Sequence, residues 1–140
     1  MRYAFIIDRD EFVRLSLNKI LQKYGFQVEE IEHFGQLEGR EKDIKGGMVL
    51  ADVEMEVLEK WLTLLKKWSE RFILISPLVT DELALRLKKM GIHRIIKKPV
   101  DPRILRRVIR EISFPAGVKI PSLGKRGEGS RFNQKGGEVA

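Results

Sequence analysis

Three acidic residues and one arginine follow directly on the first apolar run of the chain. The run from Tyr3 to Ile7 stops at Asp8, Arg9, Asp10 and Glu11. Carboxylates grouped at the end of a strand could hold a divalent cation, because such cations prefer oxygen ligands. A guanidinium among them opposes cation binding through repulsion of like charges. The group therefore predicts an ionic site whose metal affinity is weak unless Arg9 points away.

Further residues whose side chains could take part in a reaction stand at the ends of later apolar runs. They are Asp52 after Met48–Ala51, Ser76 after Phe72–Ile75, and Lys98-Pro99 after Ile95-Ile96. A carboxylate beside a cation can accept a phosphoryl group, and hydroxyl and ammonium groups can bind anionic oxygens. If the strands are parallel, their carboxyl ends meet at one edge of the sheet, where such sheets bind ligands. The pattern predicts that these side chains share one site with Asp8.

The strands that must position these residues are short and unevenly apolar. Tyr3–Ile7, Met48–Ala51 and Phe72–Ile75 are apolar at consecutive positions, which is typical of parallel strands covered on both faces. Residues 26–32, "FQVEEIE", alternate only in part and predict an edge strand. Ile95-Ile96 predicts a shorter strand near the end of the series.

The segments between the strands predict helices. Four of them carry apolar residues at helical spacing: Val13–Tyr24 before Gly25, Val57–Trp68, Leu83–Met90 between Thr80 and Gly91, and Leu105–Ile112 after Asp101-Pro102. A fifth segment, from Phe34 to Asp43, predicts a short, weak helix. A strand followed by a helix, five times over, predicts an α/β fold with a doubly wound parallel sheet and helices on both faces.

Composition limits the class of protein. The 140 residues are 43% hydrophobic and include no cysteine, so we expect one domain without disulfides or thiolate chemistry. No apolar run is long enough to span a membrane and no leader pattern opens the chain, which predicts a cytoplasmic protein. Helical periodicity ends after Ile112. We therefore expect a domain over residues 1–113 and a flexible, basic, Gly-rich tail over residues 114–140.

These residues resemble the receiver domain of response regulators, the phospho-accepting module of two-component signalling. The resemblance covers about four-fifths of the chain and rests on "IIDRDEFVRLSL", "MVLADVEM", "ILISPLVTDELAL" and "GIHRIIKKPVDPRIL". It implies a flavodoxin-like fold with strand order 2-1-3-4-5. It also implies that Asp52 is the phospho-acceptor, Asp8 one of an acidic pair that binds Mg²⁺, Ser76 the family's hydroxyl and Lys98 its lysine. The bond from Lys98 to Pro99 is expected to be cis.

Several positions depart from the family pattern around this site. They are Arg9 in place of the second acid, Pro77 in place of a residue with a phosphoryl-binding N–H, Ile95 in place of an aromatic ring, and Glu56 and Lys60 in place of the usual Pro and Gly after the acceptor. We expect weaker Mg²⁺ binding, one phosphoryl contact fewer and an early start of the following helix. Together the departures predict a divergent receiver.

Three arrangements of the acidic group stay open. A local bulge could bring Asp10 into the vacated metal position, or Asp10 could N-cap the first helix. Arg9 could instead pair with Asp8 and Asp52 as a built-in replacement for the metal, because neighbouring carboxylates would otherwise repel one another.

Two functions follow from these arrangements. In one, the protein is a stand-alone, non-enzymatic response regulator, and a sensor histidine kinase or phosphotransfer protein phosphorylates Asp52. In the other, it is a pseudo-receiver, which binds a partner protein without phosphorylation. The last helix carries a basic flank that either is simply solvated or docks an acidic partner: Arg103, Arg106, Arg107 and Arg110. A third hypothesis is that the basic tail, with Phe132, contacts nucleic acid.

Overall fold

Five short strands form one parallel sheet, as the apolar runs predict. In the computed structural model, which describes residues 2–113, the strands are β1 (Arg2–Ile7), β2 (Phe26–Glu30), β3 (Met48–Ala51), β4 (Phe72–Ser76) and β5 (Arg94–Lys97). Their order is β2-β1-β3-β4-β5, which confirms the predicted fold and places β2 at an edge. The predicted tail over 114–140, with its hypothesised nucleic-acid contact, lies outside the described residues.

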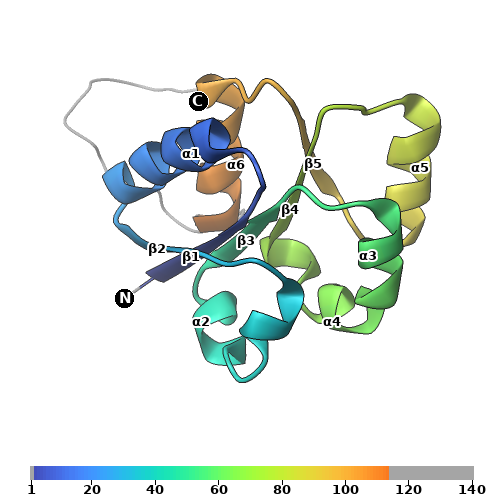
Figure 1. The fold of residues 1–140 in the computed structure, drawn as a ribbon, viewed down its shortest axis with the longest axis horizontal. Helices are drawn as coiled ribbons and strands as arrows, with labels where there is room; N and C mark the ends of the chain where they lie inside the picture. Colours follow the sequence, from blue (N-terminus) through green and yellow to red (C-terminus); the bar gives the residue numbers. More distant parts are fainter. Residues whose placement is uncertain (1, 114–140) are drawn as a thin grey trace, which may run out of the picture.

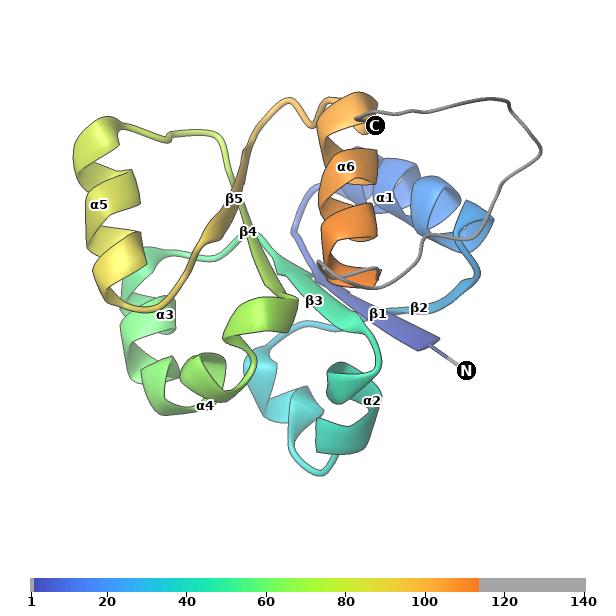
Figure 2. The same ribbon diagram turned by 180° about the vertical axis from the view of Figure 1, so that it is seen from behind.

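Helices cover both faces of the sheet (Figures 1 and 2). They are α1 (Glu11–Lys23), the 3-10 helix η1 (Phe34–Leu37), α2 (Glu41–Lys45), α3 (Met55–Lys60), α4 (Leu62–Lys67), the 3-10 helix η2 (Ser69–Arg71), α5 (Asp81–Lys89) and α6 (Pro102–Ser113). Residues of α1 and α6 pack on one face, and residues of α2 to α5 pack on the other. No helix within residues 2–113 is long and apolar enough to cross a membrane.

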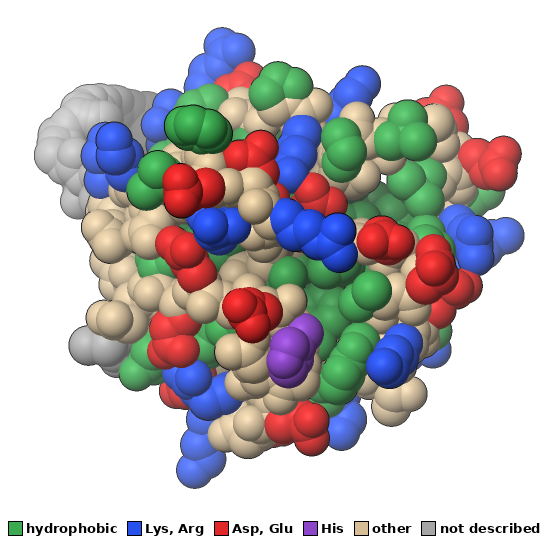
Figure 3. Space-filling view, in the orientation of Figure 1, with side chains coloured by type: hydrophobic (Ala, Val, Ile, Leu, Met, Phe, Trp, Pro, Cys, Tyr) green, Lys and Arg blue, Asp and Glu red, His purple; other side chains and the backbone are tan. Residues whose placement is uncertain are grey.

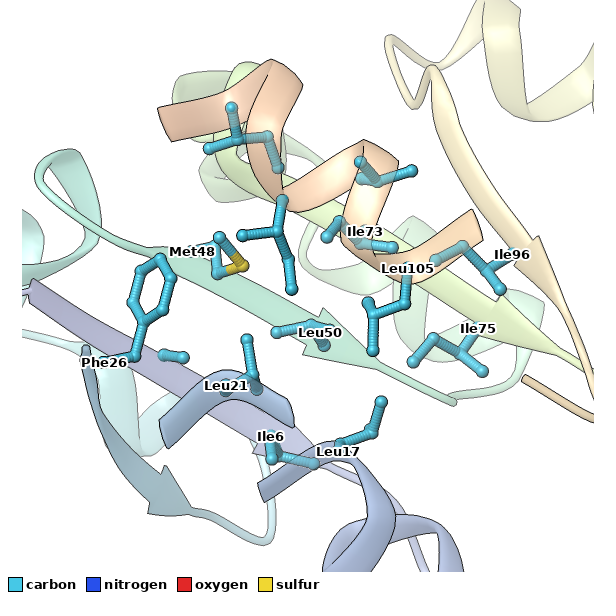
Figure 4. Packing of buried hydrophobic residues seen from close by; sticks show 14 residues of the cluster. Ile6, Leu17, Leu21, Phe26, Met48, Leu50, Ile73, Ile75, Ile96 and Leu105 are labelled. Carbon is cyan, nitrogen blue, oxygen red and sulfur yellow. The ribbon is translucent and has the colours of Figure 1, made fainter. Parts of the chain in front are cut away.

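The strands β1, β3 and β4 are buried on both faces. Figure 4 shows the core under α1 and α6, where Ile6, Leu50 and Ile75 of the sheet meet Leu17 of α1 and Leu105 of α6. A second core on the other face is built from the alternate strand residues and the apolar residues of α3, α4 and α5. Two cores explain why these strands are apolar at every position rather than at every second one.

Local signals set the ends of the helices. Asp10 N-caps α1, and its Oδ1 accepts hydrogen bonds from the backbone N–H groups of Phe12 (2.9 Å) and Val13 (3.3 Å). Thr80 caps α5 in the same way through Leu83 N (3.1 Å). Gly91 follows α5 with φ of +88°, a left-handed conformation that glycine adopts without a steric penalty. These signals agree with the predicted starts and stops.

Two predicted helices are divided in the structure. The stripe from Val57 to Trp68 forms α3 and α4, which are separated at Trp61 (φ −102°, ψ 15°). The break turns the Trp61 ring edge-on to Phe34, at 6.3 Å between centroids. The segment from Phe34 to Asp43 gives η1 and the start of α2, with Gly39 between them at φ +81°. A residue in that region cannot continue a right-handed helix.

A charged cluster at the carboxyl edge of the sheet

The register of the sheet brings the predicted site residues together. Ile7 pairs with Ala51, so Asp8 and Asp52 follow their strands side by side. The backbone N–H of Asp52 extends this ladder by donating to Ile7 O (2.8 Å), and that of Lys98 donates to Ser76 O (2.9 Å). The four residues therefore lie at one edge because β1, β3, β4 and β5 are parallel and end at the same level.

Lys98 stands between the two aspartates. Its Nζ lies 2.9 Å from Asp8 Oδ2 and 2.5 Å from Asp52 Oδ2. The side chain of Asp8 is only 2% exposed, and those of Lys98 and Asp52 are 16% and 26% exposed. A carboxylate as buried as that of Asp8 is costly without a partner, and the ammonium provides one. The chain thus neutralises much of its own acidic pair.

Two opposing effects act on the pKa of Lys98. Burial lowers it, but hydrogen bonds to Asp52 and Asp8 and the attraction of both carboxylates raise it, and the net pKa lies above the ordinary value of 10.5. Lys98 is therefore charged at neutral pH, and the cluster contains one cation for two carboxylates.

The rest of Asp8 is held by the loop that follows it. Its Oδ1 accepts a hydrogen bond from the backbone N–H of Asp10 (2.8 Å), and its carbonyl accepts one from Arg14 Nη1 (2.7 Å). Its Oδ2 is buried, and the Lys98 ammonium, 2.9 Å away, is what stabilises it. This geometry orients Asp8 toward Lys98 and Asp52.

Arg9 does not take part in the cluster. Its side chain is 96% exposed, and its ion pair is with Glu54 at 3.9 Å, on the surface. The hypothesis that Arg9 pairs with Asp8 and Asp52 is therefore wrong. The physical reason is the alternation of side chains at the end of a strand: Asp8 faces inward, so the next residue faces outward. Lys98 occupies the position that the hypothesis gave to Arg9.

The side chain of Asp10 caps helix α1 and does not face the two aspartates. Its Oδ1 caps α1, which confirms the capping interpretation and contradicts the bulge that would have made Asp10 a metal ligand. Within residues 2–113, no three His, Cys, Asp or Glu side chains are grouped so that they could hold a metal ion. Asp8 and Asp52 face an ammonium, Arg9 stands in place of the second acid and Asp10 caps α1, so the residues present do not supply the acidic pair of a Mg²⁺ site.

Comparison with known proteins identifies the fold to which this structure is similar. No protein-family model and no curated protein matches the sequence. A two-component response regulator from Clostridium difficile matches with a TM-score of 0.65 and 15% identity, over 80% of this chain and 95% of that one. The chemotaxis response regulator CheY4 of Vibrio cholerae matches with a TM-score of 0.63 and 16% identity, over 80% and 98%. The beryllofluoride-activated NtrC4 receiver domain matches with a TM-score of 0.63 and 21% identity, over 81% and 100%.

This chain has the fold of a response-regulator receiver domain. The predicted departures from the receiver pattern can be located in it. Pro77 is exposed directly after β4, and Ile95 is half-buried and packs on the second core. The helix α3 begins at Met55, three residues after Asp52, as expected from the residues that replace the usual Pro and Gly. The Lys98–Pro99 bond is cis, as the resemblance implies.

Ser76 lies at the edge of the cluster, but its hydroxyl forms hydrogen bonds with the backbone of Leu78. Its Oγ donates to Leu78 O (3.2 Å) and accepts from Leu78 N (3.3 Å). Its hydroxyl is thus engaged with the loop that precedes α5 of the receiver fold. Ser76 shares the strand edge with Asp52 and Lys98, as predicted, and is held by its own loop.

The predicted basic flank lies on the outer side of α6. Arg103, Arg107 and Arg110 are exposed, and Arg106 is half-buried. Arg103 is held by Asp101, with Nη2 3.2 Å from Oδ2. Its guanidinium lowers the pKa of Asp101 through hydrogen bonds. Nothing in the flank contacts the charged cluster, so the two features are separate surfaces of the receiver fold.

A cleft beside the cluster was not predicted. It has a volume of about 1090 Å³, begins at Asp8, Asp52 and Lys98, and continues toward β2 and α3. Figure 3 shows the hollow, with hydrophobic side chains inside and charged ones at its rim. It lies between the residues that follow β2 (30–34), the start of α3 and the loop after β4.

Proposed function

We propose that this protein is a receiver-fold signalling module that acts by binding a partner protein, without metal-dependent phosphoryl transfer. The observation that carries the proposal is the position of the Lys98 ammonium, within 2.9 Å of Asp8 and 2.5 Å of Asp52. A cation supplied by the chain compensates the acidic pair, so the folded state does not need a metal ion there.

The neighbours of the cluster support the same function. Arg9 replaces a potential carboxylate ligand and points to solvent, and Asp10 is used as a helix cap. Pro77 has no N–H group to donate to a phosphoryl oxygen. Each change removes a contact that phosphoryl transfer would use while leaving the fold intact, and this favours a module selected for binding.

The basic flank of α6 is the surface we propose for the partner. Three of its four arginines are exposed, and only Arg103 forms an ion pair among the described residues. A row of guanidinium groups on one helix attracts carboxylates and can bind them in a bidentate manner. We therefore expect a partner with an acidic surface.

A second function is favoured by the accessibility of Asp52. Its side chain is 26% exposed at the mouth of the cleft, beside the Lys98 ammonium. In this alternative, a carboxylate oxygen of Asp52 attacks the phosphorus of a phosphohistidine on a sensor kinase or phosphotransfer protein. The new O–P bond forms as the N–P bond breaks, and the histidine nitrogen leaves with the electron pair. Lys98 would then contact the transferred oxygens.

Intact mass separates the two functions. The full chain is incubated with acetyl phosphate, with and without Mg²⁺, beside the Asp52→Asn variant and an active receiver domain as a positive control. We expect no phosphate adduct on this protein while the control is labelled. An adduct that requires both Mg²⁺ and Asp52 would overturn the proposal and establish the phosphorelay function.

The basic flank is tested separately. Arg107→Glu with Arg110→Glu should abolish co-purification of an acidic partner from cells, whereas Lys66→Glu with Lys67→Glu on α4 should not. Equal capture by both double variants would exclude the flank as the docking surface.

A further inference from the structure

Two helices form the outer surface on one side of the sheet. Helices α1 and α6 lie side by side over the same core (Figures 1 and 2). Arg2 joins their carboxyl ends, because its guanidinium donates to the carbonyl of Tyr24, the C-cap of α1 (2.6 Å), and to Ser113 Oγ at the end of α6 (3.0 Å). The side of the two helices that points away from the core, here called the outer face, is therefore one continuous surface.

Large apolar side chains are exposed on these two helices. The described residues include five such side chains, and three of them belong to α1 and α6: Phe12 (81% exposed), Leu15 (52%) and Ile104 (38%). On α1, the exposed pair lies three residues apart and opposite Leu17 and Leu21, which are buried in the core. Packing in the core therefore does not explain why these positions are apolar.

The exposed charged side chains of the same helices are mostly basic. Five basic residues stand against two acidic ones, which gives a net charge of +3: Lys19, Lys23, Arg103, Arg107 and Arg110 against Glu11 and Glu111. Arg103 is paired with Asp101, whereas the other four basic side chains form no ion pair within residues 2–113. These four cations are available to anions outside the described chain.

We propose that the outer face of α1 and α6 binds a membrane surface that contains anionic lipids. Phe12, Leu15 and Ile104 enter the interface between headgroups and acyl chains, and the four unpaired basic side chains contact lipid phosphates. Lys and Arg beside exposed Phe and Leu on one helical surface are typical of proteins that lie on such membranes.

The mixture of apolar and basic residues favours lipid over the other anionic ligands. A nucleic acid attracts the cations but offers no apolar surroundings to Leu15 and Ile104. An acidic protein would have to present apolar contacts at dispersed points on two helices. A lipid surface presents anionic and apolar groups everywhere and needs no matching shape.

The inference goes beyond the proposed function by adding a lipid ligand. The basic flank of α6 is part of the outer face, so a membrane and the proposed acidic partner would compete for Arg107 and Arg110. Phe12 and Leu15 distinguish the two ligands, because they lie on α1, outside the flank. Their replacement should weaken lipid binding and leave capture of the partner unchanged. Failure of vesicle binding and failure of partner capture are therefore separate results.

Co-sedimentation of the full chain with lipid vesicles is the first measurement. One set of vesicles is phosphatidylcholine alone, and the other contains about one-third phosphatidylglycerol, which is anionic. Each Lys or Arg close to an anionic surface contributes about fivefold to binding, so we expect the partition coefficient to be at least roughly tenfold higher for the anionic vesicles. Binding should weaken as salt is added, because salt screens the attraction.

Charge reversals locate the basic part of the contact. Arg107→Glu with Arg110→Glu should weaken binding to anionic vesicles by roughly tenfold or more. The matched control is Lys66→Glu with Lys67→Glu, which makes the same change in net charge on α4, in the opposite helical layer. At physiological salt the control should change binding by less than about twofold, because charges so far from the lipid are screened.

Polar substitutions test the apolar part of the contact. Phe12→Ser and Leu15→Ser should each weaken binding to anionic vesicles by roughly threefold or more, because an apolar side chain leaves the interface. Leu85→Ser on α5 is the matched control, because Leu85 is 57% exposed and Leu15 is 52% exposed. It should leave binding unchanged. All these residues except the phenylalanine and leucine of α1 lie at exposed positions of other helices, and circular dichroism checks that each variant is folded.

The absence of cysteine allows the orientation of the bound protein to be measured. A single polarity-sensitive fluorophore is attached through Ser16→Cys on α1 or through Thr63→Cys on α4, both at exposed positions. Anionic vesicles should shift the emission of the label on α1 to shorter wavelength and leave that of the label on α4 unchanged.

Three results would overturn the inference. The first is binding that does not differ between neutral and anionic vesicles. The second is an equal shift of both labels, or an equal loss of binding in the two charge reversals, which would show attraction without a fixed orientation. The third is unchanged binding in Phe12→Ser and Leu15→Ser, which would exclude insertion and leave the arginines to an acidic protein.

Discussion

Replacing Lys98 with methionine would leave the carboxylates of Asp8 and Asp52 together without their cation. Methionine retains an unbranched side chain of similar length, so the change removes charge with little loss of packing. Removing one partner of a fully buried ion pair costs roughly 3–5 kcal/mol. Because 26% of the Asp52 side chain and 16% of the Lys98 side chain are exposed, water compensates part of this loss. We expect the free energy of unfolding to fall by about 1–3 kcal/mol at neutral pH.

The pH dependence of this loss identifies its cause. The pKa of Lys98 in the folded protein is raised above 10.5, so its contribution to stability is complete below that pH and is lost as pH rises through the folded value. The difference between wild type and variant should therefore be complete at neutral pH and should shrink as the pH rises above 10.5.

Urea unfolding at about pH 7 and about pH 11 measures this dependence. Lys97→Met is the matched control, because Lys97 is the exposed neighbour of Lys98. If Lys98→Met were no less stable than Lys97→Met at neutral pH, Lys98 would not compensate the aspartates. A loss of the same size at both pH values would refute the electrostatic explanation and indicate a packing effect.

Further variants test individual features. Because the side chain at position 9 points to solvent, Arg9→Asp should change Mg²⁺ affinity by no more than about twofold in an NMR titration, and a rise of roughly tenfold or more would show that a carboxylate at this position reaches the site. Asp10→Ala should lower the free energy of unfolding by about 1 kcal/mol, and Asp10→Ser should restore most of it, unless the cap is dispensable. Gly47→Ala should cost about 3 kcal/mol, because its Cβ would lie 1.8 Å from Tyr3 O. Gly46→Ala, whose Cβ would meet nothing closer than 3.9 Å, should change stability by no more than about 0.5 kcal/mol in the same assay.

The order of elements could be predicted from the sequence because burial leaves a clear pattern. Met48–Ala51 is apolar at every position, and all four of its residues are buried between the two helical layers. Phe26–Glu30 alternates only in part, and it is the edge strand β2. Once the strands were known to be parallel, the meeting of Asp8, Asp52 and Lys98 at one edge followed from chain direction alone.

Side-chain direction at the strand ends could not be predicted in the same way. Arg9 is adjacent to Asp8 in sequence, yet the cation that contacts Asp8 and Asp52 is Lys98, 46 residues from Asp52. The choice depends on which of two adjacent side chains faces inward: alternation turns Arg9 outward once Asp8 faces inward, but residue types alone do not say which of the two does so. The divided helices have a similar cause, since the conformations of Gly39 and Trp61 are fixed by their surroundings.

The position of Lys98 also explains how Arg9 can be tolerated beside an acidic pair. A cluster that depended on a bound metal ion would lose its compensating charge when a carboxylate ligand was replaced by arginine, and the buried Asp8 would destabilise the fold. Here the compensating charge belongs to the chain and arrives from β5, on the opposite side of Asp52 from β1 in the sheet. Stability at this edge is thereby separated from metal binding. A substitution at Arg9 should therefore cost little stability, whereas a substitution at Lys98 or Asp8 removes one partner of a largely buried ion pair.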